Sequence, residues 1–124
     1  LEAGIVLPEE LYGLSEFSVE SGYRQAKAIL EKNSDIDIIS CATDTIAAGA
    51  MEALKECKKE RREKVKVTGF GDNQFLKAVS EGITTVHFYY KTSGIKAAEM
   101  LLDIFEEGHQ VPIRMKLGYQ IMEH

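Results

Sequence analysis

The sequence has no tryptophan and only two prolines and two cysteines among its 124 residues. Because no Pro-, Gly- or Ser-rich linker interrupts it, we expect a single domain, and this length suffices to bury a core without covalent staples. Cys41 and Cys57 are sixteen positions apart and fit no C-x-x-C motif. We therefore expect two free thiols in a reducing compartment.

Long apolar runs are also absent. No stretch approaches the roughly 18 apolar residues of a membrane span, and the opening LEAGIVLPEELYG lacks the basic start of a signal peptide. We expect a cytoplasmic protein with no membrane partner. Since the chain begins without methionine, it is also expected to be a piece of a longer protein. Its net charge of -5 argues against nucleic-acid binding by this chain alone.

The spacing of apolar residues predicts alternating helices and strands. The predicted helices cover residues 18–33, 44–59, 75–82 and 92–107, and the predicted strands cover 36–42, 65–70 and 83–88. The alternating tail over 113–122 is typical of an antiparallel or edge strand. Because strands and helices alternate at βαβ spacing, we expect the α/β class, with a mainly parallel sheet flanked by helices.

Two further expectations concern individual segments. Residues 55–66, KECKKERREKVK, mix seven basic with three acidic residues and are interpreted as the end of a helix followed by a solvated connection. In the last predicted helix, one face is expected to point inward and Gly108 to end the helix. The residues of that face are Ile95, Ala98, Leu102 and Phe105.

Ligands of parallel α/β sheets bind beyond the carboxyl ends of the strands. Thr43, Asp44, Gly71 and Asp72 occupy such positions, as do residues 87–90. The two carboxylates could cap helices, bind a ligand, or act as a phosphoryl acceptor and a metal ligand. Aromatic rings beside polar groups are what a sugar site uses, because C–H faces stack on rings while polar side chains take the hydroxyls.

Common catalytic motifs are missing. The third glycine of G-x-G-x-x-G would fall at Gln74, and no P-loop, H-E-x-x-H or G-x-S-x-G occurs. His87, His109 and His124 fit no recognised metal-ligand or catalytic motif with a cysteine or a carboxylate. We expect no cofactor, no metal site and no enzymatic activity.

Three blocks in fixed order identify a family resemblance. They are CATDTIAAGAMEAL at 41–54, VKVTGFGDN at 65–73 and GITTVHF at 82–88, followed by a helix start at Ser93-Gly94. From about residue 14 onward, the chain closely resembles the effector-binding region of the lactose-repressor (LacI/GalR) family of transcriptional regulators. The resemblance implies a periplasmic-binding-protein-like fold with flavodoxin-like subdomains, a sugar or other small effector between two subdomains, and allosteric control of repression.

The resemblance also implies roles for aromatic residues. Phe17 falls where many members stack an aromatic on the ligand ring, and Phe88 and Tyr90 fall among further pocket residues. A roomy pocket with aromatic walls favours a disaccharide such as sucrose or trehalose over a purine.

Four polar or small residues receive implied roles as well. Thr43 stands where the family usually has an effector-contacting Asn, and Asp44 matches a nearly constant Asp that is more a helix cap than a ligand. Gly71 replaces the first Asp of the common G-F-D-D, whereas Asp72 keeps the second. This departure removes an acidic acceptor for sugar hydroxyls and leaves more room in the pocket.

Residues 1–124 would form only part of an effector-binding and dimerisation domain. Residues from about 86 to 108 would cross to the other subdomain, the tail from Ile113 would return, and operator DNA would be bound only through a missing N-terminal domain. We expect a homodimer, swapped near Val86 if the uncovered segment exchanges, and weak sugar binding by the fragment. The expected interface residues are Ala47, Ala48, Met51, Ala78 and Val79.

Two other functions remain open from the sequence. A sugar-binding protein of a transporter shares the two-lobed fold but would be exported. An enzyme of flavodoxin-like topology would use Asp44 and Asp72.

Overall fold

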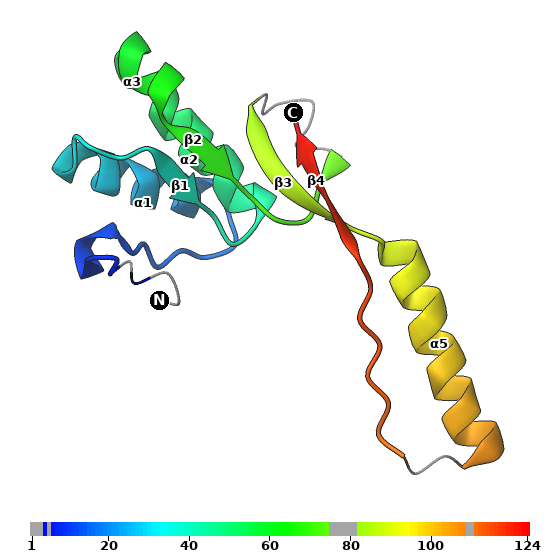
Figure 1. Cartoon of the computed structure of the whole chain (residues 1–124). Coiled ribbons are helices and arrows are strands. Elements are labelled where there is room, and N and C mark those ends of the chain that lie inside the picture. Colours follow the sequence, from blue (N-terminus) through cyan, green and yellow to red (C-terminus); the bar gives the residue numbers. More distant parts are fainter. Residues whose placement is uncertain (1–3, 5, 75–81, 109–110) are drawn as a thin grey trace.

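The computed structural model describes residues 4, 6–74, 82–108 and 111–124. The helices are α1 (Val19–Lys32), α2 (Asp44–Lys55), α3 (Lys59–Lys64) and α5 (Tyr90–Glu107), preceded by a 3-10 turn, η1 (Glu9–Leu11). The strands are β1 (Ile38–Ser40), β2 (Lys66–Thr68), β3 (Ile83–Phe88) and β4 (Tyr119–Glu123). Figure 1 shows α1, α2 and α3 gathered around β1 and β2, whereas α5 extends away from them.

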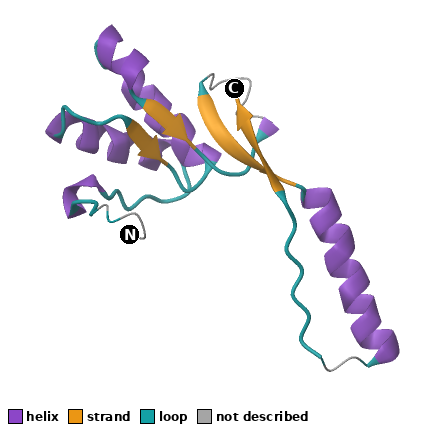
Figure 2. Cartoon of the chain, viewed as in Figure 1, coloured by secondary structure: helices purple, strands orange, loops and turns teal. Residues whose placement is uncertain are grey.

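The four strands form one sheet in the order β1-β2-β3-β4. The first three run parallel, and β4 pairs antiparallel with β3, from Thr84 opposite Glu123 to Phe88 opposite Tyr119. Backbone hydrogen bonds continue the pairing of β2 with β3 beyond the strand ends, from Gly69 N to the Thr84 carbonyl and from Gly71 N to the Val86 carbonyl. The expected mainly parallel α/β sheet is confirmed (Figure 2).

The core lies between α1, α2 and the parallel strands. Ser18 caps α1 and Thr43 caps α2, each accepting a hydrogen bond from the amide three residues later. Near the start of α1 the two helices almost touch, because a Cβ on Gly22 or on Gly49 would meet the backbone of the other helix. The buried apolar side chains of this core are Ala26, Leu30, Ile36, Cys41, Ile46, Ala47, Ala50, Ala53, Leu54, Val65, Val67 and Ile83.

Two expected elements are altered. Residues 59–64 of the charged segment form α3, because Lys, Glu and Arg are good helix formers, and are not a mere connection. The tail is a strand only over β4, because β3 ends at Phe88 and, within the part of the chain that the structure describes, the residues before Tyr119 have no strand to pair with. The predicted helix over 75–82 lies mostly outside the described residues.

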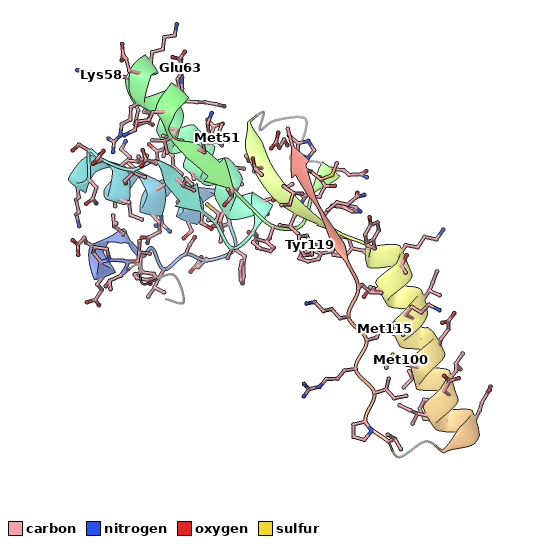
Figure 3. The ribbon with its side chains drawn as sticks, viewed as in Figure 1. Met51, Lys58, Glu63, Met100, Met115 and Tyr119 are labelled. Atoms are coloured by element: carbon pink, nitrogen blue, oxygen red, sulfur yellow. The ribbon has the colours of Figure 1, made fainter. Side chains whose placement is uncertain are left out.

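The inward face expected for α5 is wrong for this chain. Ile95, Leu102 and Phe105 are exposed, and among the described residues no other helix or strand packs extensively against α5. The helix does end at Gly108, which adopts the left-handed conformation with φ 64°. Figure 3 shows Met100 on α5 and Met115 on the tail, both far from Met51 on α2. The helix has the apolar face that its sequence pattern predicts, but no surface within the described chain covers that face.

Candidate functional site at the carboxyl edge of the sheet

The loop after β2 turns sharply at the carboxyl edge of the sheet. Gly71 has φ 123° and Asp72 has φ 53°, so two consecutive residues lie at positive φ. Glycine reaches this region without a Cβ penalty, and aspartate is among the few other residues found in the left-handed region. The turn places the side chain of Asp72 against β3, where Thr85 Oγ1 accepts the Asp72 amide at 3.3 Å.

Asp44 braces the start of α2 against this loop. Its Oδ1 accepts the hydroxyl of Thr85 at 2.5 Å, and its Oδ2 accepts the backbone amide of Asn73 at 2.7 Å. The residue is buried, and its negative charge also suits the N-terminus of a helix. The side-chain cap itself is Thr43, whose Oγ1 accepts the amide of Ile46 at 3.3 Å. Asp44 therefore joins α2, the loop and β3 through its carboxylate.

Asp72 receives two histidines that are distant in sequence. Its Oδ2 lies 2.8 Å from Nδ1 of His87 on β3, and its Oδ1 lies 2.9 Å from Nε2 of His124, the residue after β4. Its side chain is only 5% exposed. Sequence reasoning placed His87 among the residues at the strand ends but gave it no partner, and it missed His124, since only the pairing of β4 with β3 brings the two histidines to one carboxylate. Both oxygens of Asp72 are thus engaged within the chain.

Three aromatic side chains gather at the same edge, and we call Phe70, Phe88 and Tyr90 the aromatic platform. The rings of Phe70 and Phe88 stack with centroids 6.0 Å apart, and Tyr90 meets Phe88 edge-on at 6.1 Å. All three side chains are exposed. The Tyr90 hydroxyl donates to the carbonyl of Gly71 at 3.1 Å, which ties α5 to the loop. Sequence reasoning missed Phe70, although it directly precedes Gly71.

Phe17 lies in the segment before α1 and is 76% exposed. The close approach of Gly49 to the backbone of Val19 and Tyr23 places the start of α1 beside the first half of α2. Phe17 and Thr43 therefore belong to the same end of the molecule. Phe17 is free to contact a ligand there, because little of its ring is covered by the chain.

The residues expected in the dimer interface differ in how much of their surface is exposed. Ala47 has no exposed surface and Ala48 has 4%, so both are covered within the single chain and offer almost no contact area. Met51 is half-buried at the middle of α2. Ala78 and Val79 lie outside the described residues. The interface itself stays a prediction.

A pocket of about 140 Å³ lies elsewhere, among α1, α2 and α3. Lys27 and Glu56 form an ion pair of 2.8 Å beside it, and this contact raises the pKa of Lys27 and lowers the pKa of Glu56. None of the residues lining the pocket is among those predicted to contact the effector. Within the described part of the chain, no helix combines the length and apolarity that a membrane crossing requires.

The chain is similar to known transcriptional regulators. It is 35% identical over 122 residues to the HTH-type transcriptional regulator RegA of Clostridium saccharobutylicum, covering 98% of this chain and 37% of RegA. The structure of the transcriptional regulator CelR in complex with cellobiose superposes with a TM-score of 0.82 at 24% identity, over 98% of this chain and 37% of that one. The structure of the lac repressor dimer bound to operator and the anti-inducer ONPF superposes with a TM-score of 0.75 at 22% identity. The match covers 88% of this chain and 38% of that one.

The chain thus spans little more than a third of the length of these relatives. Residues 1–123 match the family of periplasmic binding protein-like domains. The solved structures show the shared fold, and the relatives named here carry the names of regulators. The chain belongs to the family of periplasmic binding protein-like domains, and it shares the fold of the transcriptional regulators CelR and the lac repressor.

Proposed function

We propose that this chain is the effector-binding and dimerisation part of a cytoplasmic, sugar-responsive transcriptional repressor that works by allostery and catalyses no reaction. The observation that carries the proposal is the exposed aromatic platform at the carboxyl edge of the sheet. Aromatic faces bind the C–H faces of sugars, and ligands of open α/β sheets bind at this edge. The relative CelR has been solved in complex with cellobiose, a disaccharide, which supports the same class of effector here.

The proposed effector site combines rings with one hydroxyl. Phe17, Phe88 and Tyr90 provide apolar faces, and Thr43 can still donate its hydroxyl proton while its oxygen caps α2. Gly71 contributes a carbonyl and open space, since a Cβ built on it meets nothing closer than the Tyr90 hydroxyl at 3.4 Å. Asp44 and Asp72 act as supports of the site, because their oxygens are engaged by neighbouring residues. We infer that a disaccharide is the effector.

The crossing between subdomains is part of the proposal. Residues from about 86 to 108 would pass to the other subdomain, and the tail from Ile113 would return along the same route, because Phe88 and Tyr119 are register partners. The exposed apolar face of α5 supports this arrangement, since such faces seek a partner. Effector binding would then close a hinge and shift the population of DNA-competent homodimers. Operator DNA would be bound only by an N-terminal domain.

The experiment uses the full-length protein and the DNA upstream of its own gene. Fluorescence anisotropy measures DNA binding while cellobiose, sucrose or trehalose is added. At least one of these sugars is expected to change the apparent DNA affinity by about tenfold, the middle of the usual range for allosteric coupling. The Phe88→Ala variant should bind DNA normally and lose the sugar response. DNA binding that no sugar alters would contradict the proposal, and sugar binding without DNA binding would favour a transport protein.

A further inference from the structure

Three side chains from three separate elements meet behind the loop that carries Gly71. Asp72 comes from the loop, His87 from β3 and His124 from the residue after β4. His87 Nδ1 lies 2.8 Å from Oδ2 of Asp72, and His124 Nε2 lies 2.9 Å from Oδ1. Because each histidine contacts a different oxygen, the two do not compete for the same acceptor. The carboxylate is buried, whereas the His87 and His124 side chains are 32% and 20% exposed.

The two contacts fix where the imidazole protons lie. An ionised carboxylate can only accept hydrogen bonds, so each ring nitrogen that faces Asp72 must carry a proton. In its neutral form His87 must therefore be the Nδ1–H tautomer, whereas neutral His124 must be the Nε2–H tautomer. The two contacts therefore predict opposite neutral tautomers for His87 and His124.

The carboxylate that both histidines contact belongs to Asp72, which has an uncommon backbone conformation. Asp72 has φ 53° directly after Gly71 at φ 123°, and conformations of this kind persist where the surroundings hold them. The same turn presents the Gly71 carbonyl to the Tyr90 hydroxyl at 3.1 Å. Tyr90 in turn meets Phe88. Holding Asp72 therefore also holds the position of the aromatic platform.

We propose that His87 and His124 are positioning residues of the effector site, which clamp Asp72 and thereby set the loop and the platform without touching the effector. This inference rests on the proposed function for its effect on affinity, but the clamp itself does not. It also gives β4, the strand that returns from α5, a direct connection to the site. The last strand of the chain is thereby coupled to effector binding through one side chain.

The tautomers are tested by NMR on the full-length protein labelled with ¹⁵N at its histidine rings. At a pH where both imidazoles are neutral, His87 is expected to carry its proton on Nδ1 and His124 on Nε2. Single His→Gln variants assign the signals. The same tautomer at both residues, or free tautomer exchange at either, would overturn the clamp whether or not any sugar binds.

The effect on affinity is tested with matched variants. His87→Leu and His124→Leu remove the donors, whereas His87→Asn and His124→Gln keep an N–H donor near Nδ1 and Nε2 respectively. In calorimetric titrations with cellobiose, sucrose and trehalose, each Leu variant is expected to bind the recognised sugar about fivefold more weakly, and each amide variant within about twofold of the unaltered protein. Leu variants with unaltered affinity, or amide variants as weak as the Leu variants, would overturn the positioning role.

The same Leu and amide variants also cover the case in which a variant does not fold. If a Leu variant does not fold, the amide variant still tests the role, because it must retain both stability and affinity. If the unaltered protein binds none of the three sugars, the proposed function fails, whereas the tautomer measurement still decides the clamp.

Discussion

The hydroxyl of Thr85 donates a hydrogen bond to Oδ1 of Asp44, and both residues are buried. This contact joins the middle of β3 to the first turn of α2, which lie 41 positions apart in the sequence. Without the hydroxyl, Asp44 would keep a buried charge with one donor fewer. Such a loss costs far more than a surface hydrogen bond is worth.

The Thr85→Val variant is therefore expected to lower the free energy of unfolding by about 2 to 3 kcal/mol, since Val fills the same volume without a donor. Thr85→Ser keeps the hydroxyl, so its free energy of unfolding should fall by clearly less than that of Thr85→Val. Urea denaturation of the two variants measures the difference. Equal losses in both would show that the methyl group, and not the hydrogen bond, matters at this position.

Gly69 should tolerate no side chain, whereas Gly94 should benefit from one. A Cβ on Gly69 would strike Oδ1 of Asp44 and approach Ala47, but a Cβ on Gly94 in α5 meets nothing within 4 Å. Gly69→Ala is expected to destabilise by about 1 to 3 kcal/mol. Gly94→Ala should stabilise by about 0.5 to 1 kcal/mol, because alanine is the better helix former. Thermal unfolding of both variants tests the pair, and a stable Gly69→Ala protein would contradict the packing around Asp44.

The two cysteines should differ in reactivity. Burial raises the pKa of Cys41 to about 11, so at neutral pH almost none of it is the reactive thiolate, whereas Cys57 is only half-buried. A chromogenic disulfide reagent is expected to modify one thiol of the native chain quickly and both after unfolding. Cys57→Ser should remove the fast phase. A fast phase that survives in Cys57→Ser would show that Cys41 is accessible.

Phe17 should contribute directly to sugar affinity. Phe17→Ala in the full-length protein is expected to weaken sugar binding by about 1 to 3 kcal/mol, the scale of a buried aromatic anchor. The fold should be unaffected, because the ring is largely exposed. Tyr12→Ala, another exposed aromatic of the same segment, serves as the control and should leave affinity unchanged. Calorimetry that finds no difference between the two variants would remove Phe17 from the site.

The isolated 124-residue chain should associate. Its α5 exposes an apolar face that includes Leu101, Leu102 and Phe105, and such surfaces are rare on monomers. Sedimentation equilibrium at micromolar concentration is expected to show a homodimer, by strand addition or by exchange near Val86. Phe105→Lys should weaken the dimer if α5 forms the contact. A monomer over the whole concentration range would contradict the prediction.

The sequence predicted local structure well where the pattern and the partner lie in the same segment of chain. Ser18 and Thr43 cap the helices predicted over 18–33 and 44–59, and β3 covers the predicted Ile83–Phe88. The prediction failed where the partner is distant or outside the described chain. The face of α5 was expected to be buried because it is amphipathic, yet amphipathicity says only that a partner is needed.

The candidate site shows the same division. The carboxyl edge, Thr43 and the aromatic residues at 88 and 90 could be located from strand order, because the ends of parallel strands meet at one edge. The engagement of Asp72 by His124 could not, because it joins residues 52 positions apart through the register of β4 with β3. Asp72 is a predicted effector residue on the strength of its motif, and the structure adds that each of its two oxygens lies within hydrogen-bonding distance of an imidazole nitrogen.

The central claim is that the carboxyl edge of this sheet, completed by the rest of the protein, binds a sugar. Isothermal titration of the full-length protein with cellobiose, sucrose and trehalose tests it most directly, with Phe88→Ala as the variant. At least one sugar is expected to bind with one site per chain and to lose about tenfold or more in affinity in the variant. No heat of binding from any of the three sugars up to millimolar concentration, or affinity unchanged by Phe88→Ala, would contradict the account.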